Sequence, residues 1–169
     1  MRSLIDFFVD QLMLIFDSEK QLLEILPKLI SNVSSLKLKA ALAELYEETR
    51  GQVKRLEQIF HDLGKIPNRH TSRVMESLLR DALNLIHSDY EMIVKEFALI
   101  DAIQRIKHFE IASYGVLKAL AKHFKHKHIH ELLQMNSKEE GKVDKKFTTI
   151  AKVIVNPSKK VRKSSRRAA

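Results

Sequence analysis

The stretch IQRIKHFEIASYGVL, residues 103–117, decides the fold. Its apolar residues recur at three- and four-residue intervals, which places them on one face of an α-helix. The same face carries an acid, Glu110, between Ile106 and Tyr114. The stretch therefore predicts a helix whose buried face holds one carboxylate near its middle.

The same apolar periodicity extends outward from this stretch through almost the whole chain. It predicts four long helices and one shorter one: from Ser3 into the SNVSS segment at 31–35, and at about 36–63, 71–87, 90–124 and 127–155. Ser3 is the expected N-cap of the first helix. Pro27 lies inside that helix and predicts a kink, because the apolar stripe continues beyond it. Gly64 is the expected stop of the second helix.

The connections between these helices predict the topology. The first two long helices and the last two are each joined by a short connection, so each pair should form an antiparallel hairpin. The shorter helix and its turns then cross between the hairpins. The sequence thus predicts an all-α, ferritin-like four-helix bundle over residues 1–155, followed by a disordered basic tail at 156–169.

Composition excludes several classes of protein. The 169 residues include Cys 0, Gly 4 and Pro 3. Without cysteine there can be no disulfide, thiolate metal site or cysteine nucleophile. The low glycine content argues against phosphate-binding glycine loops and against an all-β fold. No apolar stretch approaches the roughly 20 residues that span a bilayer. We therefore expect a cytoplasmic protein without a transmembrane segment.

Much of the positive charge lies in the C-terminal segment. The chain holds 30 Lys and Arg against 21 Asp and Glu, a net charge of +9. Residues 156–169 contain no acid and six of the basic residues: Lys159, Lys160, Arg162, Lys163, Arg166 and Arg167. A basic tail without aromatic residues predicts non-specific, salt-sensitive binding to nucleic acid or another acidic partner. A purely solubilising tail is the alternative.

An acid interrupts the apolar stripe near the middle of each long helix. The four acids are Glu19, Glu48, Glu110 and Glu140, and Gln52 and Asp144 follow Glu48 and Glu140 by four residues. The spacing is duplicated, since 29 residues separate the first two acids and 30 separate the last two. Two antiparallel hairpins would therefore bring these groups to one level of the core.

Buried carboxylates without a counter-charge cost several kcal/mol each. Metal ions that prefer oxygen ligands would remove this cost, and the six side chains above then predict two half-sites of a carboxylate-bridged metal centre. Two alternatives remain open. Each acid could extend to solvent at a helix edge, or it could pair with a cation such as Lys54, Arg55, Lys107 or Lys142.

Four segments resemble the YciE/YciF family of ferritin-like proteins (DUF892). They are FDSEKQLLEILPKL, ELYEETRGQVKRLEQIF, AIQRIKHFEIASYGVLKALA and EEGKVDKKFTTIA, and the likeness covers about residues 3–153. HFEIASYG, similar to the family's EHYEIASYG, is its most specific part. The resemblance implies a di-iron or ferroxidase-type centre that uses O₂ or peroxide, a homodimer, and a role in bacterial stress responses.

The resemblance favours the same acids as metal ligands and adds His108, with Gln52 also retained. Two departures from the pattern matter. Lys107 stands where the family commonly has Glu, which would place a cation near the site. The Glu-x-x-His pairs of ferritins are missing, so nearly all ligand atoms of the site would be oxygens. Manganese or magnesium therefore becomes an alternative to iron. The competing hypothesis is a metal-free helical scaffold whose basic tail binds its partner.

Overall fold

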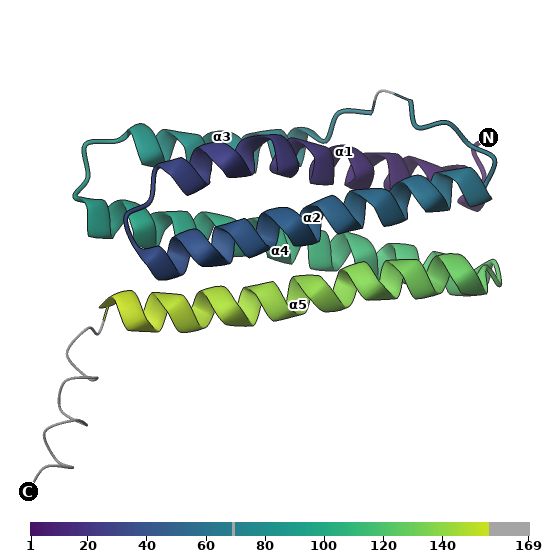
Figure 1. The fold of residues 1–169 in the computed structure, drawn as a ribbon. Helices are drawn as coiled ribbons and strands as arrows, with labels where there is room; N and C mark the ends of the chain where they lie inside the picture. Colours follow the sequence, from purple (N-terminus) through teal and green to yellow (C-terminus); the bar gives the residue numbers. More distant parts are fainter. Residues whose placement is uncertain (69, 156–169) are drawn as a thin grey trace, which may run out of the picture.

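The chain is all-helical in the part that the computed structural model describes, residues 1–68 and 70–155 (Figure 1). Its helices are α1 (Leu4–Ser31), α2 (Leu36–Asp62), α3 (Arg73–His87), α4 (Met92–His123) and α5 (Lys127–Val155). Each corresponds to a predicted helix within a few residues. The predicted basic tail at 156–169 lies outside the described residues, and its expected disorder stays a prediction.

Serine residues begin the first three helices. Ser3 caps α1 as predicted, in a reciprocal capping box with Asp6. Ser35 and Ser72 cap α2 and α3 by accepting backbone N–H groups in the first turn. Such caps satisfy donors that have no partner within the helix. α1 continues through Pro27, as the uninterrupted apolar stripe predicted.

Two helices end in the same left-handed turn. Gly64 follows α2 with φ 59°, and the Lys65 N–H donates to the Phe60 carbonyl. Lys125 follows α4 with the same φ of 59°, and the His126 N–H donates to the Ala121 carbonyl. Glycine adopts this conformation without steric cost, whereas lysine does not. Gly64 therefore ends α2 as predicted.

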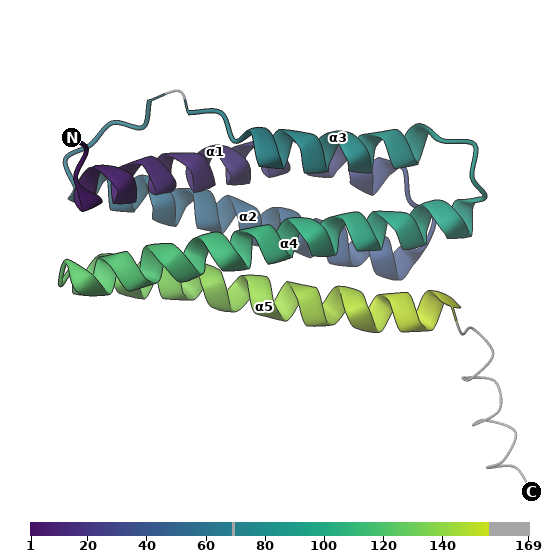
Figure 2. The same ribbon diagram turned by 180° about the vertical axis from the view of Figure 1, so that it is seen from behind.

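The long helices lie side by side along a common axis (Figures 1 and 2). α1 packs against α2 and α4 against α5, while α2 also contacts α5 and α1 contacts α4. Successive long helices within each pair run in opposite directions, as Figure 1 shows. α3 packs on α1 and α4 and lies within the connection between the two pairs.

The apolar core is divided into two clusters, one toward each end of the molecule. Along α1, residues up to Ile15 belong to one cluster and residues from Leu22 onward to the other. Along α4 the change falls between Ile106 and Tyr114. Polar residues occupy the level between the clusters. They are Glu19, Thr49, Gln52, Lys107, Glu110, Asn136 and Glu140, all buried.

Glu96 ties the start of α4 to the connection between α1 and α2. Its side chain is buried, and its Oε1 accepts the backbone N–H groups of Ser34 at 2.6 Å and Ser35 at 2.7 Å. The two helix pairs are thus joined at this end by a charge-assisted contact. Among the described helices, none combines the length and apolar character needed to cross a membrane.

Candidate metal centre

Three glutamates from three helices converge at the polar level of the core. Glu19 of α1, Glu110 of α4 and Glu140 of α5 are each fully buried. One carboxylate oxygen of each lies within 4.8 Å of the others. The periodicity that turned these positions inward in the sequence therefore brings them together in space, as predicted.

A lysine ammonium lies inside this group of acids. The Lys107 Nζ is 2.5 Å from the Glu110 Oε2 and 2.8 Å from the Glu140 Oε2, and all three side chains are completely shielded from solvent. The ammonium therefore forms ion pairs with acids of two helices inside the core. The alternative that a lysine neutralises some of the acids is therefore realised at Glu110 and Glu140.

Hydrogen bonds fix the orientation of the remaining groups. The Tyr114 hydroxyl donates to the Glu19 Oε1 at 2.6 Å and accepts from the Asn136 Nδ2 at 3.0 Å. The Arg55 guanidinium, near the surface, donates to the Asn136 Oδ1. The Gln52 Nε2 donates to the Glu140 Oε1 at 2.5 Å. A continuous chain of hydrogen bonds thus runs from Arg55 to Glu19.

Several buried oxygens at this level have no hydrogen-bond donor. They include the Glu19 Oε2, the Glu110 Oε1, the Gln52 Oε1 and the Glu48 Oε2. A buried acceptor without a partner costs free energy, and its presence calls for an ion, a water molecule or a proton. All four atoms are oxygens, the ligand type that divalent iron, manganese and magnesium accept.

The electrostatics of the centre favour added positive charge. Burial, followed by the charge of Glu140, raises the pKa of Glu19 to about 8. Burial and the charge of Glu19 also raise the pKa of Glu110 well above its usual value. Burial opposes the charged form of Lys107, but Glu110 and Glu140 outweigh this effect and raise its pKa. One ammonium is therefore insufficient to stabilise all three ionised carboxylates.

The other predicted ligands lie at the margin of this group. Gln52 is buried and bonded to Glu140, whereas Glu48 is half-buried. Asp144 lies outside the converging group and accepts from Gln104 at 3.0 Å. His108 is 67% exposed, and its Nε2 lies 3.4 Å from the Asp144 Oδ1. His108 and Asp144 therefore face each other near the surface.

Asn136 is a site residue that the sequence did not single out as functional. It is buried and links Tyr114 to Arg55. Its position four residues before Glu140, on the same inward face, was the available signal. An asparagine on a buried face needs hydrogen-bond partners, and the hydroxyl of Tyr114 supplies one.

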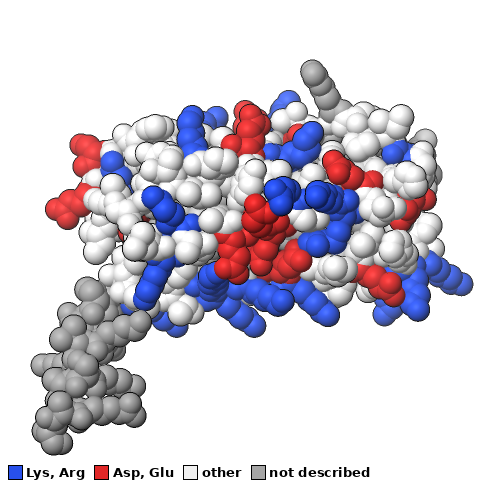
Figure 3. Space-filling model, viewed as in Figure 1, with Lys and Arg blue, Asp and Glu red and all other residues white. Residues whose placement is uncertain are grey.

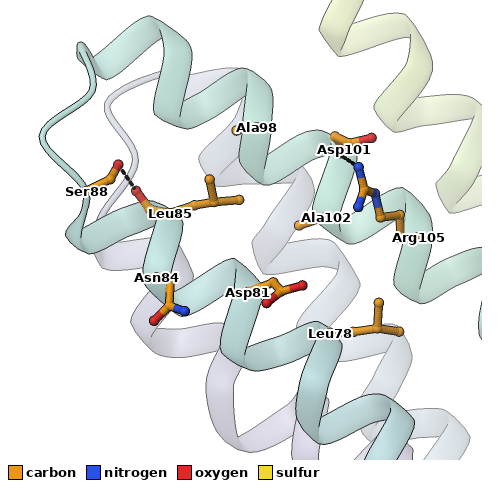
Figure 4. Close-up of a pocket in the computed structure, with 9 residues that line it drawn as sticks. All are labelled: Leu78, Asp81, Asn84, Leu85, Ser88, Ala98, Asp101, Ala102 and Arg105. Carbon is orange, nitrogen blue, oxygen red and sulfur yellow. Dashed lines mark hydrogen bonds and ion pairs between the residues drawn. The ribbon is translucent and has the colours of Figure 1, made fainter.

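A hollow of about 450 Å³ lies elsewhere on the molecule, between α3 and α4 (Figure 4). Apolar side chains such as Leu78 and Leu85 line it together with Asp101 and Arg105. Figure 4 shows the Arg105 guanidinium directed at Asp101, at a distance of 2.7 Å. These charges already pair with each other, and the hollow includes none of the converging glutamates.

Comparison with known proteins places the chain in a family. Residues 3–159 match the family described as a domain of unknown function, DUF892. The chain is also 35% identical over 161 residues to Protein YciF of Escherichia coli (strain K12), across 95% of this chain and 96% of that protein. The chain belongs to the DUF892 family. The resemblance found in the sequence is thereby confirmed.

Solved structures of similar proteins share the DUF892 fold seen here. The crystal structure of the E. coli stress protein YciF superposes with a TM-score of 0.89 at 35% identity, covering 92% of this chain and 99% of that one. The protein YcfI from Rhodopseudomonas palustris gives a TM-score of 0.84 at 30% identity, covering 88% of this chain and 94% of that one. The buried glutamate group of this DUF892 chain could hold a metal ion.

Proposed function

We propose that this chain is a ferritin-like four-helix bundle that binds divalent metal, with iron as the physiological ion, at the converging glutamates. The observation that carries the proposal is the set of buried oxygens without donors at Glu19, Glu110 and Gln52. Such atoms are costly unless a cation or proton meets them. The proposed activity is oxidation of Fe(II) by O₂ or peroxide in a bacterial stress response, in the cytoplasm.

The residues present fit a metal ion. Glu19, Glu110 and Glu140 each offer one carboxylate oxygen, and these oxygens lie within 4.8 Å of one another. The amide oxygen of Gln52, beside Glu140, would be a fourth metal ligand. An all-oxygen set suits iron(II), manganese(II) or magnesium, and the lack of imidazole lowers selectivity for iron. Manganese therefore remains the main alternative metal.

Glu48, Asp144 and His108 are proposed as outer ligands. Glu48 has a buried Oε2 without a donor, which a metal ion could satisfy. Asp144 and His108 would have to leave their mutual contact at 3.4 Å. We accordingly rank Glu48 ahead of these two as a ligand.

Acidic side chains also gather on the surface near the centre (Figure 3). Figure 3 shows them gathered midway along the face formed by α2 and α5. Burial, then the charges of Glu139 and Glu44, raise the pKa of Glu48. A concentration of negative charge attracts cations and increases their local concentration. Glu139 pairs with Arg55 and Glu44 with Lys146, so their negative charge is partly neutralised and their attraction for metal ions would be weak.

The chain's own residues define how the centre would work. When bound, iron would supply the redox chemistry for oxidation by O₂ or peroxide. Tyr114 holds the Glu19 carboxylate by one oxygen and leaves the other free to face a cation. Two apolar clusters flank the level of the acids and shield it from bulk solvent.

The test compares metal content and Fe(II) oxidation in wild type and a Glu19→Gln/Glu140→Gln double variant. Glutamine keeps the shape of each side chain but removes its charge. Glu24→Gln is the matched control, because Glu24 is an exposed acid on α1. We expect the double variant to lose both metal and oxidation while the control retains them. Equal iron uptake and oxidation in all three proteins would refute the proposal.

A metal-free scaffold is the second candidate function. The Lys107 ion pairs favour it, since they neutralise part of the centre without a metal. In this case the basic residues at 156–169, which lie outside the described residues, would bind nucleic acid or an acidic partner. Deleting residues 156–169 should then abolish retention on DNA at low salt, and unchanged retention would count against this candidate.

The homodimer is proposed to form through the start of α4. Large apolar side chains there are between 43% and 57% exposed: Tyr90, Met92, Ile93, Val94 and Phe97. An apolar surface of this kind is typical of protein interfaces. Light scattering should show a dimer for wild type and for Met135→Asp, a control on α5, and a monomer for Ile93→Asp/Phe97→Asp. A dimer in every case would exclude this surface.

A further inference from the structure

We propose that the Lys107 ammonium occupies one cation position of the carboxylate centre, so that this chain binds one divalent metal ion in its core and not a pair. The inference rests on the proposed function, because it assigns the number of ions held at that site. It concerns a residue of this chain, Lys107, and can be tested by counting bound metal.

The position of the ammonium carries the inference. The Lys107 Nζ lies between carboxylates of two different helices, at 2.5 Å from the Glu110 Oε2 and 2.8 Å from the Glu140 Oε2. Glu110 and Glu140 would also be ligands of a metal ion held at this level, so the ammonium would compete with it for their oxygens. The lysine side chain is completely buried, and these distances leave no space for a water molecule between it and either acid. A metal ion at this point would have to displace the ammonium.

The packing makes this displacement unfavourable. Lys107 lies at the boundary of the apolar cluster that includes Ile103 and Ile106 of the same helix. Moving the ammonium away from Glu110 and Glu140 would leave a buried charge without its partners, which is costly in a protein interior. The lysine is therefore a fixed component of the centre.

The remaining charge leaves room for one ion. If a metal ion displaces their protons, three ionised carboxylates against one ammonium leave two negative charges, which one divalent ion would balance. The free oxygens lie apart from the lysine contacts, at the Glu19 Oε2 and the Glu110 Oε1. Lys107 makes no ion pair with Glu19 among the described contacts. The single metal ion is accordingly assigned to the side of the centre that Glu19 provides.

The experiment counts Mn(II) bound by the full-length chain after removal of all metal. Wild type is compared with Lys107→Glu, which replaces the internal cation by another oxygen ligand. Lys142→Glu is the control, since it makes the same change of charge at an exposed position of α5. We expect one Mn(II) per chain for wild type and the control, and two for Lys107→Glu. Electron paramagnetic resonance should then change from an isolated ion to a coupled pair.

The outcomes separate the two proposals. Two ions in wild type, or one ion in both wild type and Lys107→Glu, would overturn the role of the lysine and leave the metal site standing. No ion in wild type would overturn both. If Lys107→Glu fails to fold, Lys107→Gln provides the second measurement. Removal of the charge should lower the Kd for the single Mn(II) by roughly tenfold or more, and an unchanged Kd would overturn the inference.

Discussion

Replacing Lys107 by methionine should strongly destabilise the metal-free protein. Methionine has similar length but no charge, so Glu110 and Glu140 would lose the ammonium that lies 2.5 Å and 2.8 Å from them. Removing one partner of a fully buried ion pair costs about 3–5 kcal/mol. At about 2–4 °C per kcal/mol for a chain of this size, the melting temperature should fall by roughly 6–20 °C.

Thermal unfolding followed by circular dichroism, in the presence of a chelator, would measure this loss. Lys142→Met is the matched control, because Lys142 is exposed and its replacement should change stability by less than about 0.5 kcal/mol. Adding Mn(II) should restore part of the stability of Lys107→Met, since the ion would neutralise the same acids. The metal should raise its melting temperature more than that of wild type.

A Lys107→Met protein as stable as wild type would refute this reasoning. It would mean that the carboxylates take up protons at no net cost once the lysine is gone. Stability lost equally in the Lys142→Met control would point to a general effect of charge. Either result would remove the basis for treating the ammonium as a component of the centre.

Three further predictions concern other parts of the chain. The pKa of Glu19 is raised from 4.5 to about 8, so the folded form keeps a proton that the unfolded chain releases. As the pH rises from about 4.5 to about 8, the free energy of unfolding without metal should therefore fall by up to roughly 5 kcal/mol. Denaturant titrations of Glu19→Gln should show a weaker dependence of this free energy on pH. Glu96→Gln should lower the free energy of unfolding in urea by about 1–2 kcal/mol, because it weakens the hydrogen bonds from the Ser34 and Ser35 N–H groups. A smaller loss would show that the charge of Glu96 is unimportant for these bonds. Lys125→Gly should raise the urea midpoint by the equivalent of about 1 kcal/mol, since φ is 59°, and a lower midpoint would contradict the assignment of strain.

The helices could be predicted because their apolar periodicity is strong and their ends carry specific residues. Ser3 and Gly64 marked two of these ends, and the stripe beyond Pro27 indicated that α1 continues. The inward positions of Glu19 and Glu110 followed from the same spacing. The helix ends depend on nearby residues, and the inward positions depend on the repeat of the α-helix. Both could therefore be predicted without knowing which helices contact one another.

The margin of the centre was harder to predict, because four residues advance an α-helix by slightly more than one turn. Asp144 is therefore rotated relative to Glu140, and it lies near the surface beside His108. Glu48 and Gln52 differ in burial for the same reason. Spacing alone cannot decide which member of such a pair lies deeper, since this depends on how the neighbouring helix is rotated.

Lys107 illustrates a different limit. Its position, four residues after Ile103 and three before Glu110, lies on the inward face by the same period. Lysine is almost never fully buried without a partner, so the sequence left open whether its side chain would bend toward solvent. The answer depended on Glu140, which is contributed by another helix and whose distance from Lys107 only the folded structure provides.

The level of polar residues between the two apolar clusters also fixes how the helices are aligned lengthwise. Sliding one helix past its neighbours by a turn, about 5.4 Å, would push Glu19 or Glu110 into an apolar cluster and separate it from its partners. Each buried charge misplaced in this way would cost several kcal/mol. The buried acids therefore favour one lengthwise alignment of the helices, and a misaligned packing would be destabilised even without a metal ion.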